Sequence, residues 1–177
     1  MKNLLFLLLF SASIFLFNSC DTYADVPEPE PEPELINNKI TYKTDDWRTI
    51  DVISDYFDAK ITSNTCNQGN GVIIFDRQLT RIGYLGYSPI GVFYERDHLI
   101  SIDLPETITY IGDWCFNGCQ RLKTVYIRSI VPPVLRNSVF GRTSDDLKIY
   151  VPAGSKDAYE NASDWSEYKD RLIFTNY

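Results

Sequence analysis

The chain has 177 residues, of which 24 are acidic and 17 are basic, so its formal net charge is −7. Most of this charge lies in the first 34 residues, because the remainder holds 18 acidic and 16 basic residues. A nearly neutral remainder without a basic patch excludes nucleic acid as the expected partner. Its length suffices for one domain with its own core.

The first 17 residues have the composition of a targeting signal. Lys2 is their only charged residue, and the apolar run behind it falls short of the roughly 20 residues that span a bilayer. The run leads to Ser19-Cys20, and a small residue directly before a cysteine resembles the lipobox of bacterial lipoproteins. The resemblance implies that residues 1–19 are a cleaved signal peptide and that a lipid on Cys20 anchors the chain to a membrane. An ordinary secretory signal and an uncleaved anchor are the alternatives.

Residues 20–38 are expected to hold the lipidated cysteine and a stalk. Proline and glutamate alternate from Pro27 to Glu34, and this composition favours extended polyproline II over a packed core. An acidic segment directly behind a lipidated cysteine also resembles the surface-export signals of some Gram-negative anaerobes. We therefore expect a protein of the bacterial cell envelope, lipid-anchored in the outer membrane and exposed at the cell surface.

Residues 39–71 are expected to form an N-terminal cap of β-hairpins. The first hairpin is predicted to turn at Asp45-Asp46-Trp47, between the runs 40–44 and 49–52. The second is predicted to turn at the glycine-rich stretch 67–71, because glycine and asparagine suit a tight turn. Its second strand leads into the first repeat.

An internal repeat occupies residues 72–152. Phe93, Phe116 and Phe140 are separated by 23 and 24 residues. A degenerate earlier copy spans Val72–Gly83 and ends on Thr-x-Ile-Gly, as the next unit does. One unit cannot bury its own apolar face, so we expect the units to stack. The apolar positions of the expected strands are Ile102 and Leu104, Val125 and Ile127, and Ile149 and Val151.

The C-terminal cap, residues 153–177, is expected to contain one or two short helices. Ser155 is a suitable helix N-cap, and Asp157 lies favourably in the first turn. The apolar residues that recur near helical spacing are Ala158, Tyr159, Ala162, Trp165 and Tyr168.

The stretch Leu99–Cys119 resembles the BspA-like leucine-rich repeat almost throughout. It reads L-I-S-I-D-L-P-E-T-I-T-Y-I-G-D-W-C-F-N-G-C, with Cys115 in place of a common alanine. The resemblance covers residues 39–177, and the stretch Tyr84–Asp97 departs from it by its length. It implies an α+β fold, predominantly β: a short leucine-rich-repeat solenoid with an N-terminal β-hairpin cap and a C-terminal helical cap.

Three cysteines remain when Cys20 is assigned to lipid. They are Cys66, Cys115 and Cys119, and an odd number favours buried thiols, with a disulfide as the alternative. Cysteines 115 and 119 alone are too few for a zinc site. We expect no metal and no cofactor.

The sequence contains no convincing catalytic arrangement. His98 is the only histidine, and its neighbours Asp97 and Ser101 are close in sequence, which does not make a triad. We expect it in a turn at the surface. The acidic pairs at 45–46 and 145–146 suit turns better than paired catalytic carboxylates. We therefore expect that the chain is not an enzyme.

The residues between the apolar strand positions are expected to face solvent as a strand face. Register predicts one row of Ile74, Asp103, Tyr126 and Tyr150, a second of Val72, Ser101, Thr124 and Lys148, and a third of Asp76, Pro105, Arg128 and Pro152. The expected ligand-binding residues are Asp103, Tyr126, Arg128, Lys148 and Tyr150, because tyrosine and arginine dominate binding hot spots. Alternatively, the tyrosines merely fill half-buried sheet surface.

These features together predict a cell-surface lipoprotein whose leucine-rich-repeat module serves protein binding or adhesion. The expected partners are the membrane, through the lipid, and a host or bacterial surface protein or glycan. The alternative is a non-catalytic glycan-capture accessory lipoprotein. A purely structural role in the envelope also stays open.

Overall fold

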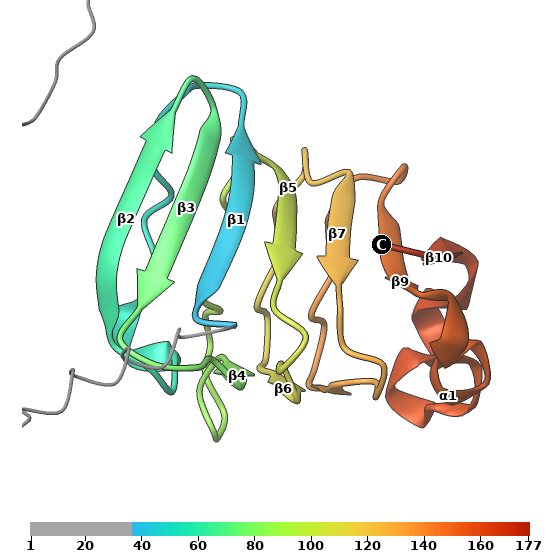
Figure 1. The fold of residues 1–177 in the computed structure, drawn as a ribbon. Helices are drawn as coiled ribbons and strands as arrows, with labels where there is room; N and C mark the ends of the chain where they lie inside the picture. The colour runs from blue at the N-terminus through green and yellow to red at the C-terminus, as the bar shows by residue number, and fades with distance from the viewer. Residues whose placement is uncertain (1–36) are drawn as a thin grey trace, which may run out of the picture. The chain divides into compact units, whose positions relative to one another are not determined.

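The computed structural model describes residues 37–177, which form two β-sheets and a few short helices (Figure 1). The expectations for the signal peptide, Cys20 and the stalk up to residue 36 lie outside the described residues. The larger sheet has the order β10-β9-β7-β5-β1-β3-β2 and the smaller one the order β4-β6-β8. The prediction of a predominantly β, α+β fold is confirmed at this level.

The strands of the larger sheet are β1 (Lys39–Thr44), β2 (Ile61–Asn67), β3 (Asn70–Phe75), β5 (Leu99–Leu104), β7 (Thr124–Ile127), β9 (Lys148–Pro152) and β10 (Leu172–Thr175). The smaller sheet consists of β4 (Arg81–Ile82), β6 (Tyr110–Ile111) and β8 (Val134–Leu135). The helices are α1 (Lys156–Asn161) and the 3-10 segments η1 (Ser54–Tyr56), η2 (Ala153–Ser155) and η3 (Ser163–Arg171).

The repeat spacing places equivalent residues side by side. Strands β5, β7 and β9 are parallel, and Ile102, Val125 and Ile149 face one another across them. Strands β4, β6 and β8 are also parallel and in register. The second and third copies therefore each contribute one strand to each sheet, the fourth contributes β9 to the larger sheet, and the register predicted for the second to fourth copies is confirmed.

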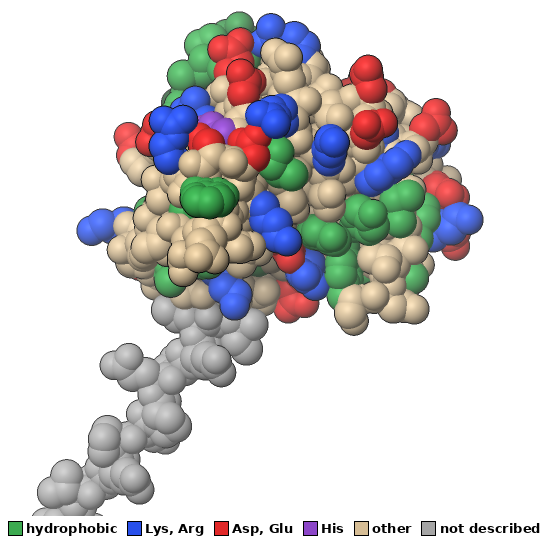
Figure 2. Space-filling model, turned by 90° about the horizontal axis from the view of Figure 1, so that it is seen from above, with side chains coloured by type: hydrophobic (Ala, Val, Ile, Leu, Met, Phe, Trp, Pro, Cys, Tyr) green, Lys and Arg blue, Asp and Glu red, His purple; other side chains and the backbone are tan. Residues whose placement is uncertain are grey.

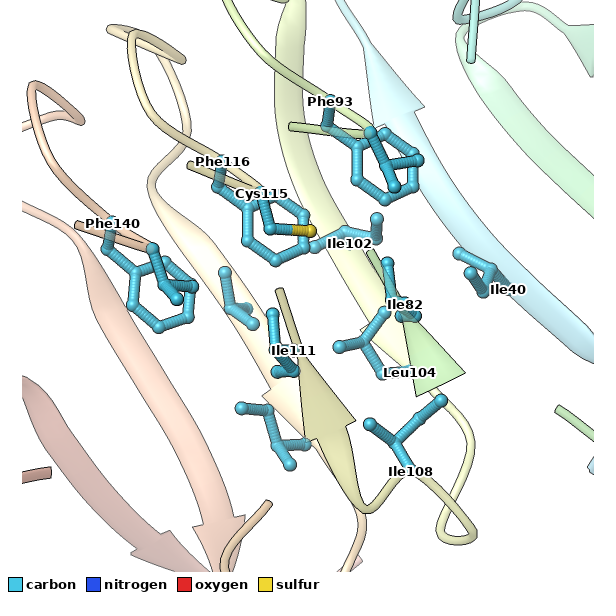
Figure 3. Packing of buried hydrophobic residues seen from close by; sticks show 14 of the residues in the cluster. Ile40, Ile82, Phe93, Ile102, Leu104, Ile108, Ile111, Cys115, Phe116 and Phe140 are labelled. Atoms are coloured by element: carbon cyan, nitrogen blue, oxygen red, sulfur yellow. The ribbon is translucent and has the colours of Figure 1, made fainter. Parts of the chain in front are cut away.

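The core contains a ladder of phenylalanine rings (Figure 3). Phe93 and Phe116 stack with their centroids 5.2 Å apart, Phe116 and Phe140 with theirs 5.4 Å apart, and both pairs are within 2° of parallel. Phe57 meets the first ring edge-on and Tyr168 meets the last ring edge-on. Aromatic rings favour these offset and edge-to-face contacts, so the ladder extends from the N-terminal to the C-terminal cap.

The first predicted hairpin is wrong. Strand β1 pairs antiparallel with β3 and β5, and residues 49–52 form no strand. Ile50 is buried instead, and its backbone is bonded by side chains: its amide donates to the Tyr42 hydroxyl, and the Asn64 amide donates to its carbonyl. These side chains replace the sheet partners that a buried backbone requires.

The second predicted hairpin is confirmed. Strands β2 and β3 pair antiparallel around a two-residue turn of Gln68 and Gly69. Their φ angles of 47° and 80° are both positive, as the tight hairpin turn with the twist of the flanking strands requires.

In the degenerate first copy, only the second half, which contains β4, pairs with the next repeat as the later copies do. Gly83 and Gly112 follow β4 and β6, and a Cβ on Gly112 would lie 2.8 Å from the Gly83 Cα, so these neighbouring units are in close contact. In the larger sheet, β1 separates β3 from β5. The neighbour of Asp103 is consequently Thr41 and not Ile74, which corrects the first predicted row.

The extra length between Gly83 and Phe93 forms a loop over residues 84–90. The chain regains the repeat register directly afterwards, because the Phe93 amide donates to the Cys115 carbonyl and the Glu95 amide to the Asn117 carbonyl. The insertion therefore leaves the phenylalanine ladder unchanged, and its residues lie outside the stack.

The C-terminal cap covers the last repeat with α1 and η3. Tyr159 and Trp165 are fully buried, and they donate hydrogen bonds to the carbonyls of Ser129 and Pro133. Helix α1 begins after Ser155, as predicted, but the Ser155 hydroxyl donates to the Pro152 carbonyl and does not cap the helix. Strand β10, which pairs parallel with β9, was not predicted.

Two of the three described cysteines are buried thiols, as expected, and Cys66 is half-buried. Burial raises the pKa of Cys115 well above its usual value, and the neighbouring Cys119 raises it further. Burial also raises the pKa of Cys119 to about 12. Both thiols therefore stay protonated and unreactive at neutral pH.

Truncation of the middle ring, Phe116→Ala, is expected to lower the free energy of unfolding by about 3–5 kcal/mol, since it opens a cavity between two stacked neighbours. Urea denaturation of the chain from residue 21 measures this loss. Tyr87→Ala is the control, because this ring is 77% exposed and its removal is expected to change stability by less than about 0.5 kcal/mol. Equal losses in both variants would contradict the role of the ladder.

Thiol accessibility is expected to separate the cysteines. In the folded chain from residue 21, Ellman's reagent reacts with Cys66, and it reaches Cys115 and Cys119 only after unfolding, since both are buried. Rapid labelling of Cys115 or Cys119 in the native state, located by peptide mass, would contradict the packing described here. A Cys66→Ser variant supplies the background rate.

Candidate functional site

The outward side chains of the larger sheet bring four of the five predicted site residues together. Asp103, Tyr126 and Tyr150 are direct neighbours across β5, β7 and β9, as predicted for their row. Arg128 lies directly after the last residue of β7. Parallel pairing in register sets this arrangement, because outward positions recur every second residue of a strand.

Arg128 and Asp103 form a bidentate ion pair. The Arg128 Nε donates to Asp103 Oδ1 at 2.8 Å, and Nη2 donates to Oδ2 at 2.7 Å. The hydrogen bonds to Asp103 raise the pKa of Arg128. The planar fork fixes both side chains in one geometry, so the positive charge of Arg128 has a defined position on the strand face.

The tyrosines of this surface form a group of three. Tyr126 and Tyr150 stack with their centroids 4.9 Å apart. Tyr177 crosses over them: its hydroxyl donates to the Tyr150 carbonyl at 2.8 Å, and the guanidinium of Arg128 lies 4.4 Å from its ring centroid. Burial raises the pKa of Tyr177 to about 12. We call Asp103, Tyr126, Arg128, Tyr150 and Tyr177 the tyrosine–arginine cluster.

Tyr177 was not among the predicted site residues, and Lys148 lies beside the cluster and not in it. The apolar run Leu172–Phe174 is the signal for β10, and the position of Tyr177 follows from that strand. Lys148 lies in the adjacent row, next to Thr124. Within residues 37–177 its side chain makes no hydrogen bond or ion pair with the cluster, so the structure does not bring it into the site.

A hollow of about 260 Å³ lies beside the cluster. Tyr126 lines it together with Thr41, Ser101 and Asp103, which have short side chains. The remaining lining residues are Tyr42, Lys43, Asn70, Gly71 and Val72. The hollow therefore combines one aromatic surface with hydroxyl, amide, amino and carboxylate groups.

The residues considered for catalysis have other contacts. His98 lies in a turn and is partly exposed at the surface, as expected (Figure 2), while its Nε2 is buried and has no hydrogen-bond partner. Asp45 pairs with Arg121, and Asp46 pairs with Arg48. Among residues 37–177, no group of three or more His, Cys, Asp or Glu side chains is placed to hold a metal ion.

The Asp103–Arg128 pair is expected to contribute only modestly to stability. The side chains are 25% and 41% exposed, and solvent-exposed ion pairs contribute about 0.2–1 kcal/mol. A double-mutant cycle of Asp103→Ala and Arg128→Ala, measured by urea denaturation, should give a coupling energy in that range that falls as salt is added. A coupling of several kcal/mol would contradict this assignment.

Comparison with known proteins agrees with the repeat architecture. The family model of the BspA type leucine rich repeat region matches residues 70–163 in six copies, which is more than half of the chain. No curated protein matches. No helix within residues 37–177 is long and apolar enough to cross a membrane. The matched segment contains β5, β7 and β9, the three strands of the smaller sheet, and the stacked rings of Phe93, Phe116 and Phe140. The chain thus belongs to the BspA-type leucine-rich repeat family.

Proposed function

We propose that this chain is a lipid-anchored protein of the bacterial cell surface that binds another protein through the strand face of its repeats, as an adhesin or receptor module. The observation that carries the proposal is the tyrosine–arginine cluster. Tyrosine and arginine are the side chains that contribute most often to binding hot spots, and here they lie together on a face formed by three successive repeats.

Contacts within the cluster restrain its side chains before any partner binds. Asp103 and Tyr177 hold Arg128 from two sides, and the rings of Tyr126 and Tyr150 hold each other. Binding therefore costs little additional side-chain entropy, which is a large part of the cost of association. A preorganised surface of this kind favours a macromolecular partner with a complementary flat face.

The scaffold that we infer is a short solenoid with a cap at each end. Its coils are the repeats that pair in parallel through β5, β7 and β9 on one side and through β4, β6 and β8 on the other. Each coil contacts its neighbours, so such a scaffold presents an extended, stiff surface.

Attachment to the membrane rests on the sequence before residue 37. The apolar run and Ser19-Cys20 support lipidation of Cys20, and the Pro/Glu segment supports a spacer between the lipid and the domain. We propose the outer membrane as the location and the cell exterior as the side. The proposal includes neither a nucleic-acid partner nor a cofactor.

Capture of a glycan is the second candidate, and the hollow beside Tyr126 favours it. One face of the Tyr126 ring stacks on Tyr150, and Tyr126 also lines the hollow together with Thr41, Ser101 and Asp103. An aromatic wall with hydroxyl and carboxylate groups beside it suits a sugar ring, which has an apolar face and a polar rim. This candidate differs from the first in the class of its partner.

Binding of the purified chain from residue 21 to intact host and bacterial cells, read by flow cytometry, tests the strand face. The Tyr126→Ala/Tyr150→Ala variant is expected to bind at least about tenfold more weakly, because loss of hot-spot side chains costs about 2 kcal/mol or more. Trp47→Ala is the matched control, since it removes an aromatic ring that is 68% exposed and lies outside the cluster. Thermal denaturation confirms that each variant is folded.

Treatment of the target cells distinguishes the two candidates. Protease treatment that abolishes binding supports a protein partner, whereas glycosidase treatment that abolishes it, together with binding to a polysaccharide panel without cleavage, supports the glycan candidate. Unchanged binding by the double tyrosine variant would remove the strand face from both.

The anchor has its own test. Mass spectrometry of the mature full-length protein is expected to find an acylated N-terminal Cys20, and Cys20→Ser is expected to release the protein from the membrane fraction. Protease shaving of intact cells then reports which side the domain faces. A mature N-terminus other than Cys20 would contradict lipid anchoring and leave the binding test unaffected.

A further inference from the structure

Exposed apolar side chains gather on one part of the domain. Ten large apolar side chains are exposed in residues 37–177, and seven of them lie on two segments beside the smaller sheet. These seven are Tyr84, Leu85, Tyr87, Ile90, Ile130, Val131 and Val134. We call them the apolar shelf. A concentration of this kind on a water-soluble surface marks a contact with a partner or a membrane.

The two segments that carry the shelf are free of charge. Residues 82–94 contain no Asp, Glu, Lys, Arg or His, and neither do residues 129–135. A run of 13 uncharged residues is unusual in a chain in which 23% of the residues are charged. Moving a charged side chain out of water is the most costly step in transfer to an apolar phase. The two segments contain no charged side chain, so burying the shelf does not incur this cost.

Several polar groups of the two segments are bonded inside the protein. The Ser88 hydroxyl donates to the Ile90 carbonyl at 2.7 Å and lies 2.8 Å from the Tyr56 hydroxyl. The Tyr110 hydroxyl donates to the Tyr84 carbonyl, and the Ser129 hydroxyl donates to the Val131 carbonyl. These bonds hold the segments in shape and leave fewer polar groups that need water.

The shelf lies at the end of the domain where the chain arrives from its N-terminal segment. The Leu79 backbone amide donates to the Asn37 backbone carbonyl, and the Asn37 side-chain amide donates to the Glu106 carboxylate. Leu79 is two residues before β4, and the loop 84–90 follows β4 directly. Figure 1 shows this loop at the bottom of the view, where β1 begins.

The opposite end of the domain is charged. It carries the ion pairs of Asp45 with Arg121, of Asp46 with Arg48 and of Glu95 with Arg142. Figure 2, which views the molecule from above, shows acidic and basic side chains distributed over this end. Uncharged apolar segments thus lie at the end that receives the chain, which also carries the ion pair of Asp76 with Arg77, and three ion pairs lie at the other end.

We propose that the apolar shelf binds the interfacial region of the membrane that holds the anchor, an inference that rests on the proposed lipidation of Cys20. Only 16 residues lie between Cys20 and Asn37, which at about 3.1 Å per residue gives a reach of roughly 50 Å. Because the anchor keeps the domain within this reach of the bilayer, the lipid surface is the apolar phase with the highest effective concentration near the shelf. Tyrosine with aliphatic neighbours is the composition that favours the interface between headgroups and acyl chains.

Vesicle sedimentation with a chain that begins at residue 21 tests the proposal without the lipid. The wild-type chain is expected to sediment with phosphatidylcholine vesicles, and Leu85→Asp/Tyr87→Asp is expected to reduce its partition coefficient at least about tenfold, because both side chains are more than 70% exposed and lose their apolar contact with lipid. Trp47→Asp is the matched control, since Trp47 is 68% exposed at the charged end. This variant is expected to bind like the wild type.

Three outcomes would overturn the proposal. They are a wild-type chain that stays in the supernatant, a Leu85→Asp/Tyr87→Asp variant that binds as the wild type does, and a Trp47→Asp variant that loses as much binding. Analytical ultracentrifugation of the same chains identifies the other occupant: a dimer that the double variant abolishes, without vesicle binding, would assign the shelf to a second copy. Since no chain in this experiment contains Cys20, its result is independent of whether Cys20 is acylated.

Discussion

The domain depends on the side-by-side placement of identical side chains from successive repeats. A 23- or 24-residue period brings each phenylalanine onto the preceding one and each strand into register with its neighbour. Burial of one ring is possible only when the rings on both sides are present, so the stability of each unit belongs partly to its neighbours. The outward side chains of the strands follow the same register, so Tyr126 and Tyr150 are in contact although they lie 24 positions apart in the sequence.

This dependence makes the two ends of the stack special. At one end Phe57 closes the ladder, and β1 provides hydrogen-bond partners for the free edge of β5. At the other end Tyr168 closes the ladder, and β10 covers the edge of β9. Each cap thus supplies both an aromatic ring and a strand, because each end leaves an apolar surface and a row of backbone groups unpaired.

The parts of the fold that the sequence predicts are those that repetition determines. The spacing of Phe93, Phe116 and Phe140 fixes the ladder, and the same spacing fixes the neighbours on the strand face. Strand β1 was predicted, but its pairing was predicted wrongly, because its partners β3 and β5 belong to other segments and no periodicity connects them to it. An acidic turn at residues 45–47 then favoured a local hairpin that the structure does not form.

The residues of the candidate site could also be predicted from the sequence only where the repeat determines their positions. Asp103, Tyr126 and Tyr150 follow from register, whereas the bidentate contact of Arg128 with Asp103 depends on side-chain conformation. Tyr177 belongs to no repeat, so periodicity gives it no position. The loop 84–90 was visible in the sequence only as excess length, since an insertion keeps the period on either side without indicating where its own side chains point.

Strand β1 has a consequence for how domains of this type change in length. It separates β3 from β5 in the larger sheet and has no counterpart in the smaller one, where β4 and β6 touch through Gly83 and Gly112. An additional coil in front of β5 would have to displace it. A coil duplicated between β5 and β9 would find parallel neighbours on both sides in both sheets. Gene duplication can therefore extend such a molecule from its middle while both termini keep their structure.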